Sequence, residues 1–309
     1  RSALGSINGV NYNTAIGYSA GAAINTGVSN TIIGALAGDG LTSGSTNTIV
    51  GKSAMTGAST ASNNTVVGAS AGFAIAAGAG NVVMGHDAAV KMNSGGNNTF
   101  IGRLVAGEVT SGGNNVCIGI SAGDTLVGGS GNVIIGNTAR PSAGGGANQI
   151  AIGEVATCVG DNNFTFGNQG NDCNIAFGSQ NITNPSDIRL KEDIQDEEVG
   201  LDFINDLRPV TFLWKKEKDI PSHFDSYKEG SEERTMNGKY NHGFIAQEVK
   251  ATIDSYDLKE GFDMWAEDDT DGRQRVAPNA IMSVMVKAVQ ELSTQVGELQ
   301  QELKALKGE

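Results

Sequence analysis

The chain has 309 residues, 44 of them glycine, and a formal net charge of −13 at pH 7. An acidic chain without a basic stripe lacks the electrostatic footprint of nucleic-acid binding. No apolar run approaches the ~20 residues that span a bilayer, so neither nucleic acid nor a membrane is an expected partner.

The composition changes abruptly at Ser186. Residues 1–185 carry 5 of the 21 Lys and Arg, 7 of the 34 Asp and Glu, and 36 of the 44 Gly. Residues 186–309 carry the remainder, with a net charge of −11, and both Trp. The chain is therefore expected to contain two regions of different architecture, and its start at Arg1 indicates a processed or truncated N-terminus.

Residues 1–185 contain a regularly spaced sequence repeat, Asn-x-x-apolar-Gly. The glycines that close it recur every 17 residues and then after shorter steps of 14 and 11: Gly17, Gly34, Gly51, Gly68, Gly85, Gly102, Gly119, Gly136, Gly153, Gly167 and Gly178. An Asn stands four places before each of the first eight glycines, and a small residue, usually Ala, stands three places after most of them. A period of this length indicates a stacked architecture.

Each repeat predicts a short strand that cannot bury a face alone but can stack on its neighbours. The glycine allows a turn that a side chain would block, and the Asn is expected to form a ladder that caps each turn. With one coil per repeat and a strand spacing of ~4.8 Å, eleven coils would make a rod of about 50 Å. The stretches NTAIGYSAG (13–21) and NTVVGASAG (64–72) resemble the β-roll heads of YadA-type trimeric adhesins. An intertwined triple β-helix remains the alternative.

The repeats offer no catalytic or metal site. Their few carboxylates stand at non-equivalent repeat positions, and the three cysteines, Cys117, Cys158 and Cys173, lack metal-ligand spacing. We interpret the cysteines as small apolar residues and expect no cofactor and no metal.

The C-terminal region predicts a small α+β domain. We expect a short strand after Ser186, a helix over 196–207, a strand over 210–215, a mobile polar insertion over 216–239, and a strand leading into a helix over 241–253. A hairpin follows, with Asp271-Gly272 as its turn.

The last segment is a heptad helix. Its apolar positions alternate at spacings of three and four: Met282, Met285, Val289, Leu292, Val296, Leu299, Leu303 and Leu306. This pattern predicts a coiled coil, and Val at a with Leu at d would by itself favour two strands. A single amphipathic helix packed on its own domain is the alternative.

Four stretches, SDIRLKEDI (186–194), LRPVTFLWK (207–215), GFIAQEV (243–249) and the heptads, resemble the intramolecular chaperone domain of phage tail spikes and fibres, the peptidase S74 family. The resemblance implies a C-terminal domain that trimerises, templates the folding of a preceding β-rich shaft and then cuts itself off. It places the cut between Pro185 and Ser186 and carries the family's Ser-Lys dyad over to Ser186 and Lys191.

The residues fit this chemistry under one condition. A serine hydroxyl needs a base, and a lysine serves when desolvation lowers its pKa. Positions five apart do not face each other on a straight strand, so a turn or another protomer must bring the lysine to the serine. Without the resemblance, Ser-Asp before a charged segment predicts a helix cap or a linker. His242, Gln247 and Glu248 are candidates to support the dyad.

The resulting hypothesis is a phage tail fibre or spike: a shaft over 1–185, a self-cleaving chaperone domain over 186–277 and a trimerisation helix over 278–309. We expect a virion tail protein folded in the host cytoplasm, with itself as partner and a bacterial surface receptor as a further one. The alternative is a bacterial trimeric adhesin head without catalytic activity, which explains the repeats but not the C-terminal region.

Overall fold

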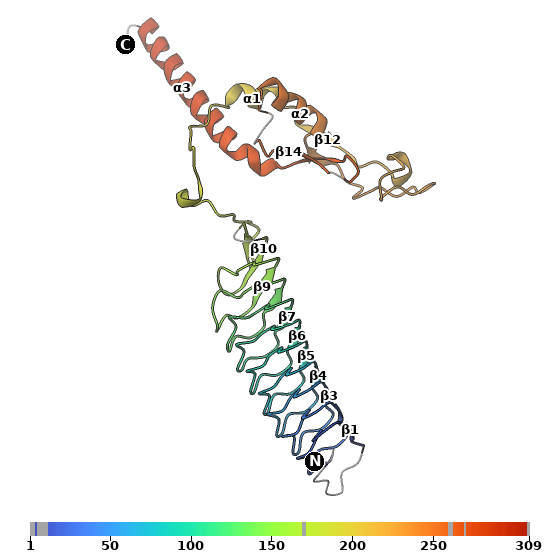
Figure 1. The fold of residues 1–309 in the computed structure, drawn as a ribbon. Coiled ribbons are helices and arrows are strands. Elements are labelled where there is room, and N and C mark those ends of the chain that lie inside the picture. The colour runs from blue at the N-terminus through green and yellow to red at the C-terminus, as the bar shows by residue number, and fades with distance from the viewer. Residues whose placement is uncertain (1–3, 5–11, 169–170, 259–261, 269, 308–309) are drawn as a thin grey trace. The chain divides into compact units, whose positions relative to one another are not determined.

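The computed structural model describes residues 4, 12–168, 171–258, 262–268 and 270–307, and the chain separates into two compact units, Arg1–Lys191 and Glu192–Glu309. The first unit is a stack of β coils and the second is a small α+β unit that contains three α-helices (Figure 1).

The coils of the first unit are joined by one long sheet that is parallel from β1 to β10 (Figure 1). Its strands are β1 (Thr14–Ile16), β2 (Thr31–Ile33), β3 (Thr48–Val50), β4 (Thr65–Val67), β5 (Val82–Met84), β6 (Thr99–Ile101), β7 (Val116–Ile118), β8 (Val133–Ile135), β9 (Gln149–Ile152), β10 (Asn163–Phe166) and β11 (Cys173–Ala176). From β1 to β8 each strand pairs in register with the residues one repeat later, as Thr14 does with Thr31. Because neighbouring strands belong to consecutive repeats of one chain, the shaft is a single-chain β-solenoid rather than an intertwined triple helix.

The expectation of eleven coils is wrong at the C-terminal end. Strand β10 is parallel to β9, but β11 runs antiparallel to β10, with Phe166 opposite Cys173. A step of 11 residues is too short for the 17-residue circuit that the earlier coils need, so the last step closes a hairpin. The hairpin therefore ends the solenoid.

Three columns of side chains fill the solenoid. The central residues of β2 to β8, the small residues three places after Gly17 through Gly153, and the apolar residues seven places after Gly17 through Gly119 are buried. The third column was not anticipated from the sequence: Ile24, Leu41, Ala58, Ile75, Met92, Val109 and Leu126. Its members vary in size, and only their shared distance from the glycine could have revealed them.

The predicted asparagine ladder is confirmed. Asn81 shows the pattern: its Oδ1 accepts from the backbone N–H of Asn98 at 3.0 Å and from Asn98 Nδ2 at 3.1 Å. Its own Nδ2 donates to Asn64 Oδ1 at 3.0 Å and to the carbonyl of Gly95 at 2.9 Å. The side chain is 1% exposed, so these bonds replace those that water would otherwise supply. In the ninth coil Gln149 stands in the Asn place.

The repeat glycines are required by close approach between coils. Gly85 has φ +137°, and a Cβ there would lie 2.2 Å from the carbonyl oxygen of Gly102 in the next coil. An L side chain is strained at this φ, and the space is already filled. The glycine period is therefore a stacking requirement as well as a turn signal.

The second unit has its own core. Its elements are α1 (Leu201–Asp206), β12 (Val210–Phe212), η2 (Glu217–Asp219), β13 (Asn241–Gly243), α2 (Ala246–Ser255), β14 (Trp265–Glu267), β15 (Gln274–Val276), η3 (Pro278–Ala280) and α3 (Ile281–Lys307). Strands β12 and β13 pair antiparallel, as do β14 and β15. Phe203 of α1 is fully buried and meets the rings of Tyr256 and Phe262 edge to face. This packing joins α1 to the segment around α2.

Three sequence expectations for this region need correction. No strand forms over the described residues 186–195, where a 3₁₀ turn, η1 (Ile188–Leu190), stands instead. Helix α1 begins at 201 rather than 196, because Gly200 adopts a non-helical conformation. The insertion over 216–239 folds around the buried Glu217, which accepts from Lys228 Nζ at 2.9 Å and from Ser231 Oγ at 2.8 Å.

Helix α3 presents two faces. Ile281, Val284 and Ala288 are buried on its own unit. The predicted heptad residues lie on another face. Their exposed fraction ranges from 46% at Val296 to 85% at Leu306. The alternative of a helix that buries its heptad face on its own domain is therefore not what this unit forms.

Candidate functional site

The 3₁₀ turn η1 brings Ser186 and Lys191 together. Lys191 Nζ donates a hydrogen bond to Ser186 Oγ at 2.8 Å. The turn is closed by backbone bonds from Leu190 N–H to the carbonyl of Asp187 at 3.0 Å and from Lys191 N–H to the carbonyl of Ile188 at 3.1 Å. A 3₁₀ turn has three residues per turn, so it doubles the chain back within the five-residue spacing. The turn required by the sequence argument is therefore present within one chain.

Asp187 starts this turn. As the N-cap residue it lies in the extended region, at φ −69° and ψ 135°, and its Oδ1 accepts from Arg189 N–H at 2.9 Å. Aspartate is among the residues preferred at this position because its carboxylate satisfies an otherwise unpaired backbone donor. The helix cap that Ser-Asp predicts does exist, but the capping residue is the Asp, and the serine hydroxyl remains available to the lysine.

Asp187 and Arg189 also form an ion pair. Arg189 Nε lies 3.0 Å from Asp187 Oδ1, and its Nη2 lies 2.5 Å from Oδ2. This pairing lowers the pKa of Asp187 and raises the pKa of Arg189. Sequence reasoning assigned no role to either residue, although an acid and an arginine two places apart beside the motif serine were visible.

Ser186 and Lys191 are exposed, as is every residue from 176 to 198. In one copy of the chain, water therefore reaches the ammonium group of the lysine and the serine hydroxyl. A lysine acts as a base at neutral pH when burial disfavours its charged form. The local geometry of a Ser-Lys pair is present in this copy, and the side chains around it are solvated.

The three candidate supporting residues belong to the second unit. His242 lies in β13, exposed, with Nδ1 3.4 Å from Thr211 Oγ1. Gln247 is exposed on α2, and Glu248 of the same helix pairs with Arg208, at 2.9 Å between Nε and Oε2. The arginine lowers the pKa of Glu248. The pairing gives Glu248 a structural contact within its own unit, and a role for any of the three at the dyad stays a prediction.

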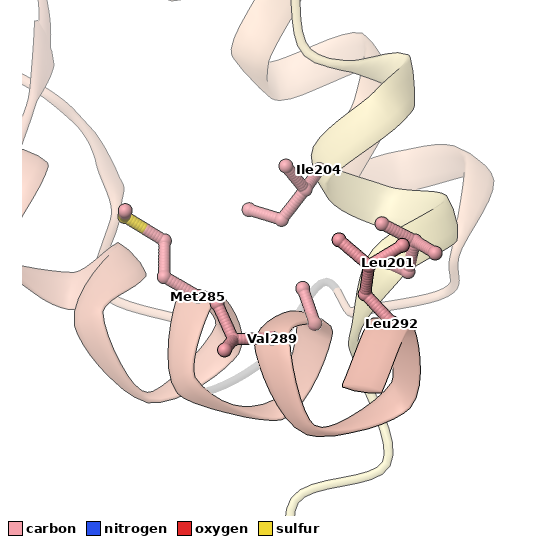
Figure 2. Close-up of a pocket in the computed structure, with 6 residues that line it drawn as sticks. Leu201, Ile204, Met285, Val289 and Leu292 are labelled. Carbon is pink, nitrogen blue, oxygen red and sulfur yellow. The ribbon is translucent and has the colours of Figure 1, made fainter. Parts of the chain in front are cut away.

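An apolar pocket lies between α1 and α3 (Figure 2). Its volume is about 190 Å³, and its lining includes Leu201 and Ile204 from α1. On the α3 side it is lined by the heptad residues Met285, Val289 and Leu292, toward which the α1 side chains point (Figure 2). The row of exposed heptad residues on α3, which we call the heptad stripe, therefore continues at the N-terminal end of α3 onto Leu201 and Ile204 of α1.

The described residues show no group of three or more His, Cys, Asp or Glu placed to hold a metal ion. Within the same ranges no helix is both long enough and apolar enough to cross a membrane. Cys117 is buried in the solenoid core, and burial raises the pKa of its thiol to about 12. A buried thiol with a raised pKa is unreactive, which agrees with its interpretation as a small apolar residue.

Residues 186–258 match the peptidase S74 family, described as chaperone of endosialidase. The match covers about a quarter of the chain and begins at Ser186. Residues 186–258 are therefore similar to a chaperone domain of this family, and the solenoid before them fits a tail fibre that ends in such a domain. The family implies self-cleaving peptidase activity. A search for similar proteins found no match among curated sequences and none among solved structures.

Proposed function

We propose that this chain is part of a phage tail fibre or spike whose C-terminal domain trimerises, templates the folding of the solenoid and severs itself from it between Pro185 and Ser186. The observation that carries the proposal is the contact between Lys191 Nζ and Ser186 Oγ, 2.8 Å long, at the first residues of the matched domain. It joins a nucleophile and a base at the seam between the shaft and the matched domain.

The proposed reaction starts with Ser186 Oγ attacking the carbonyl carbon of Pro185. Lys191 Nζ, as a neutral amine, takes the hydroxyl proton and passes it to the Ser186 nitrogen as the C–N bond breaks. Attack by the serine's own hydroxyl passes through a five-membered ring and leaves Pro185 esterified to Ser186 Oγ. Water then hydrolyses the ester and releases the Pro185 carboxylate. Each chain performs one turnover.

In this proposal, assembly of the trimer supplies the desolvation that the exposed Ser186-Lys191 pair lacks. In one copy both side chains are solvated, whereas a base lysine requires a desolvated surrounding. We infer that burial of this segment in the assembled trimer activates the pair, so that cleavage reports correct folding. The exposed heptad stripe of α3, continued by Leu201 and Ile204 of α1, is the surface that we propose for trimerisation.

The shaft in this proposal is a stiff rod of the virion tail that presents a surface to a bacterial receptor, after folding in the host cytoplasm. Its coils carry uncharged outer strand positions and few carboxylates. The adhesin alternative accounts for the same solenoid, but the match that begins at Ser186 favours the tail fibre.

Cleavage is tested by expressing the full chain and its variants and following them on denaturing gels. Wild type is expected to give fragments of 185 and 124 residues, with mass spectrometry placing the cut before Ser186. Ser186→Ala and Lys191→Ala should stay whole, and so should Lys191→Arg, which keeps the charge but cannot deprotonate. Ser283→Ala, at an exposed serine of α3, is the matched control and should cleave like wild type.

Hydroxylamine distinguishes the ester route from direct hydrolysis. A nucleophile of this kind intercepts the ester and leaves a hydroxamate at Pro185, which mass spectrometry detects. Wild-type chain that remains intact over days would refute the cleavage proposal. Sizing by light scattering tests trimerisation separately, and a monomer that cleaves as fast as the trimer would refute the role of assembly.

A further inference from the structure

The turn between Ser186 and Lys191 is held by bonds that lie within the segment itself. Asp187 Oδ1 receives the backbone N–H of Arg189 at 2.9 Å, and the Arg189 guanidinium binds the same carboxylate. The surrounding residues, 176–198, are all exposed, so no burial of this segment by other parts of the chain fixes its conformation. The proximity of the dyad in one copy therefore depends on these local bonds.

Arg189 has a second effect on the site. Asp187 and Lys191 are the residues that cap the two ends of the turn, about one turn apart. A carboxylate at that distance is a competing partner for the lysine ammonium, and such a pair would favour the charged form of the lysine. The guanidinium binds both carboxylate oxygens, with Nε 3.0 Å from Oδ1 and Nη2 2.5 Å from Oδ2. The other charged groups beside Lys191 are Glu192 and Asp193 of the same segment.

We propose that Asp187 and Arg189 are positioning residues for the cleavage: Asp187 closes the turn that carries Lys191 to Ser186, and Arg189 holds the Asp187 carboxylate away from the lysine. This inference rests on the proposed function, since it concerns the same bond. Neither side chain touches the Ser186 hydroxyl in the described contacts, and both act through the backbone and charge of the turn.

The test measures first-order cleavage of the full chain after pulse labelling in cell-free translation, in buffers from neutral to alkaline pH. Asp187→Ala is expected to slow cleavage about five- to thirty-fold at every pH, as loss of a cap worth ~1–2 kcal/mol would. Asp187→Asn keeps an oxygen that accepts from Arg189 N–H, so its rate should stay within about threefold of wild type. Glu198→Gln removes an exposed carboxylate seven residues beyond Lys191, outside the turn, and should leave the rate unchanged.

Arg189→Ala tests the second role. The freed carboxylate is expected to shift the pH dependence of cleavage toward alkaline pH. The double variant Asp187→Asn with Arg189→Ala should bring the profile back, because no carboxylate is left to compete. A profile that does not move, an Asp187→Asn variant as slow as Asp187→Ala, or an equal loss in Glu198→Gln would overturn the inference.

A second measurement does not depend on cleavage. In the full-length Ser186→Ala chain, hydrogen exchange of the peptide that contains residues 187–192 reports the bonded N–H groups of Arg189, Leu190 and Lys191. Asp187→Ala should speed this exchange several-fold and Asp187→Asn should not. Equal exchange in all three would overturn the role of the cap even if cleavage occurs. Faster exchange in Asp187→Ala supports the cap even if wild type never cleaves, which separates this inference from the proposed reaction.

Discussion

Replacing Asn81 with Ala tests whether the asparagine ladder stabilises the shaft. The side chain is 1% exposed and makes bonds to three neighbours, including the backbone N–H of Asn98 and the carbonyl of Gly95. Alanine leaves these two backbone groups buried without a partner, at about 1–3 kcal/mol each. The lost side-chain bonds and the small cavity add to this, so we expect a loss of ~3–5 kcal/mol in the free energy of unfolding.

The assay is denaturant unfolding followed by far-ultraviolet circular dichroism, at one protein concentration and in the uncleavable Ser186→Ala chain. Asn93→Ala is the matched control, because Asn93 is exposed and makes no side-chain hydrogen bond among the described residues. Such a surface change should stay within about 0.5 kcal/mol of wild type. A loss below ~1 kcal/mol at Asn81, or an equal loss at Asn93, would refute the argument that buried amides connect the coils.

Gly85→Ala should destabilise the solenoid by more than ~3 kcal/mol in the same unfolding assay, since its Cβ would lie 2.2 Å from a carbonyl oxygen, whereas Gly145→Ala, with no atom within 4 Å, should be nearly neutral. Leu299→Glu places a charge on the exposed heptad face of α3, so light scattering should show monomer in place of trimer while the helix content persists. An unchanged trimer would contradict the proposed trimerisation surface. Lys228 and Ser231 lower the pKa of Glu217, so its contribution is complete above the pKa of an unfolded Glu and is lost as pH falls through the lower folded value. Hydrogen-exchange protection factors over 216–239, corrected for the intrinsic pH dependence of amide exchange, should therefore fall on acidification in wild type, and Glu217→Gln should remove that dependence.

Much of the shaft could be predicted because its signal is local and repeated. A period of 17 fixes the register of the strand pairs from β1 to β9, and the Asn and Gly positions follow from what a stacked turn requires. The sequence shows that the last two steps are shorter, but not which structure they form. Whether a short step makes a coil or a hairpin depends on the distance that the chain must cover around the solenoid. The buried column that begins at Ile24 was not recognised in the sequence, because its residues differ in size from one coil to the next.

The second unit was less predictable. The strand and helix of 241–253 and the hairpin with its Asp271-Gly272 turn were found from local patterns and are confirmed. The fold of 216–239 around Glu217 was missed, since its polar composition looks like that of a mobile loop and its order comes from ion pairs between residues over ten positions apart. The heptads predicted α3, but not that α1 would extend the same apolar stripe.

The sequence by itself determined the repeat, its stacking register and the heptad helix, because each is carried by spacing along the chain, and its motifs from Ser186 onward resemble the S74 family. Only the tertiary structure decided that Ser186 and Lys191 meet within one chain, 2.8 Å apart, and that both are solvated there. Five residues of spacing allow many separations, and the one adopted depends on the backbone angles of a turn that Asp187 closes. Proximity and burial are properties of the folded backbone, so spacing alone could not supply them.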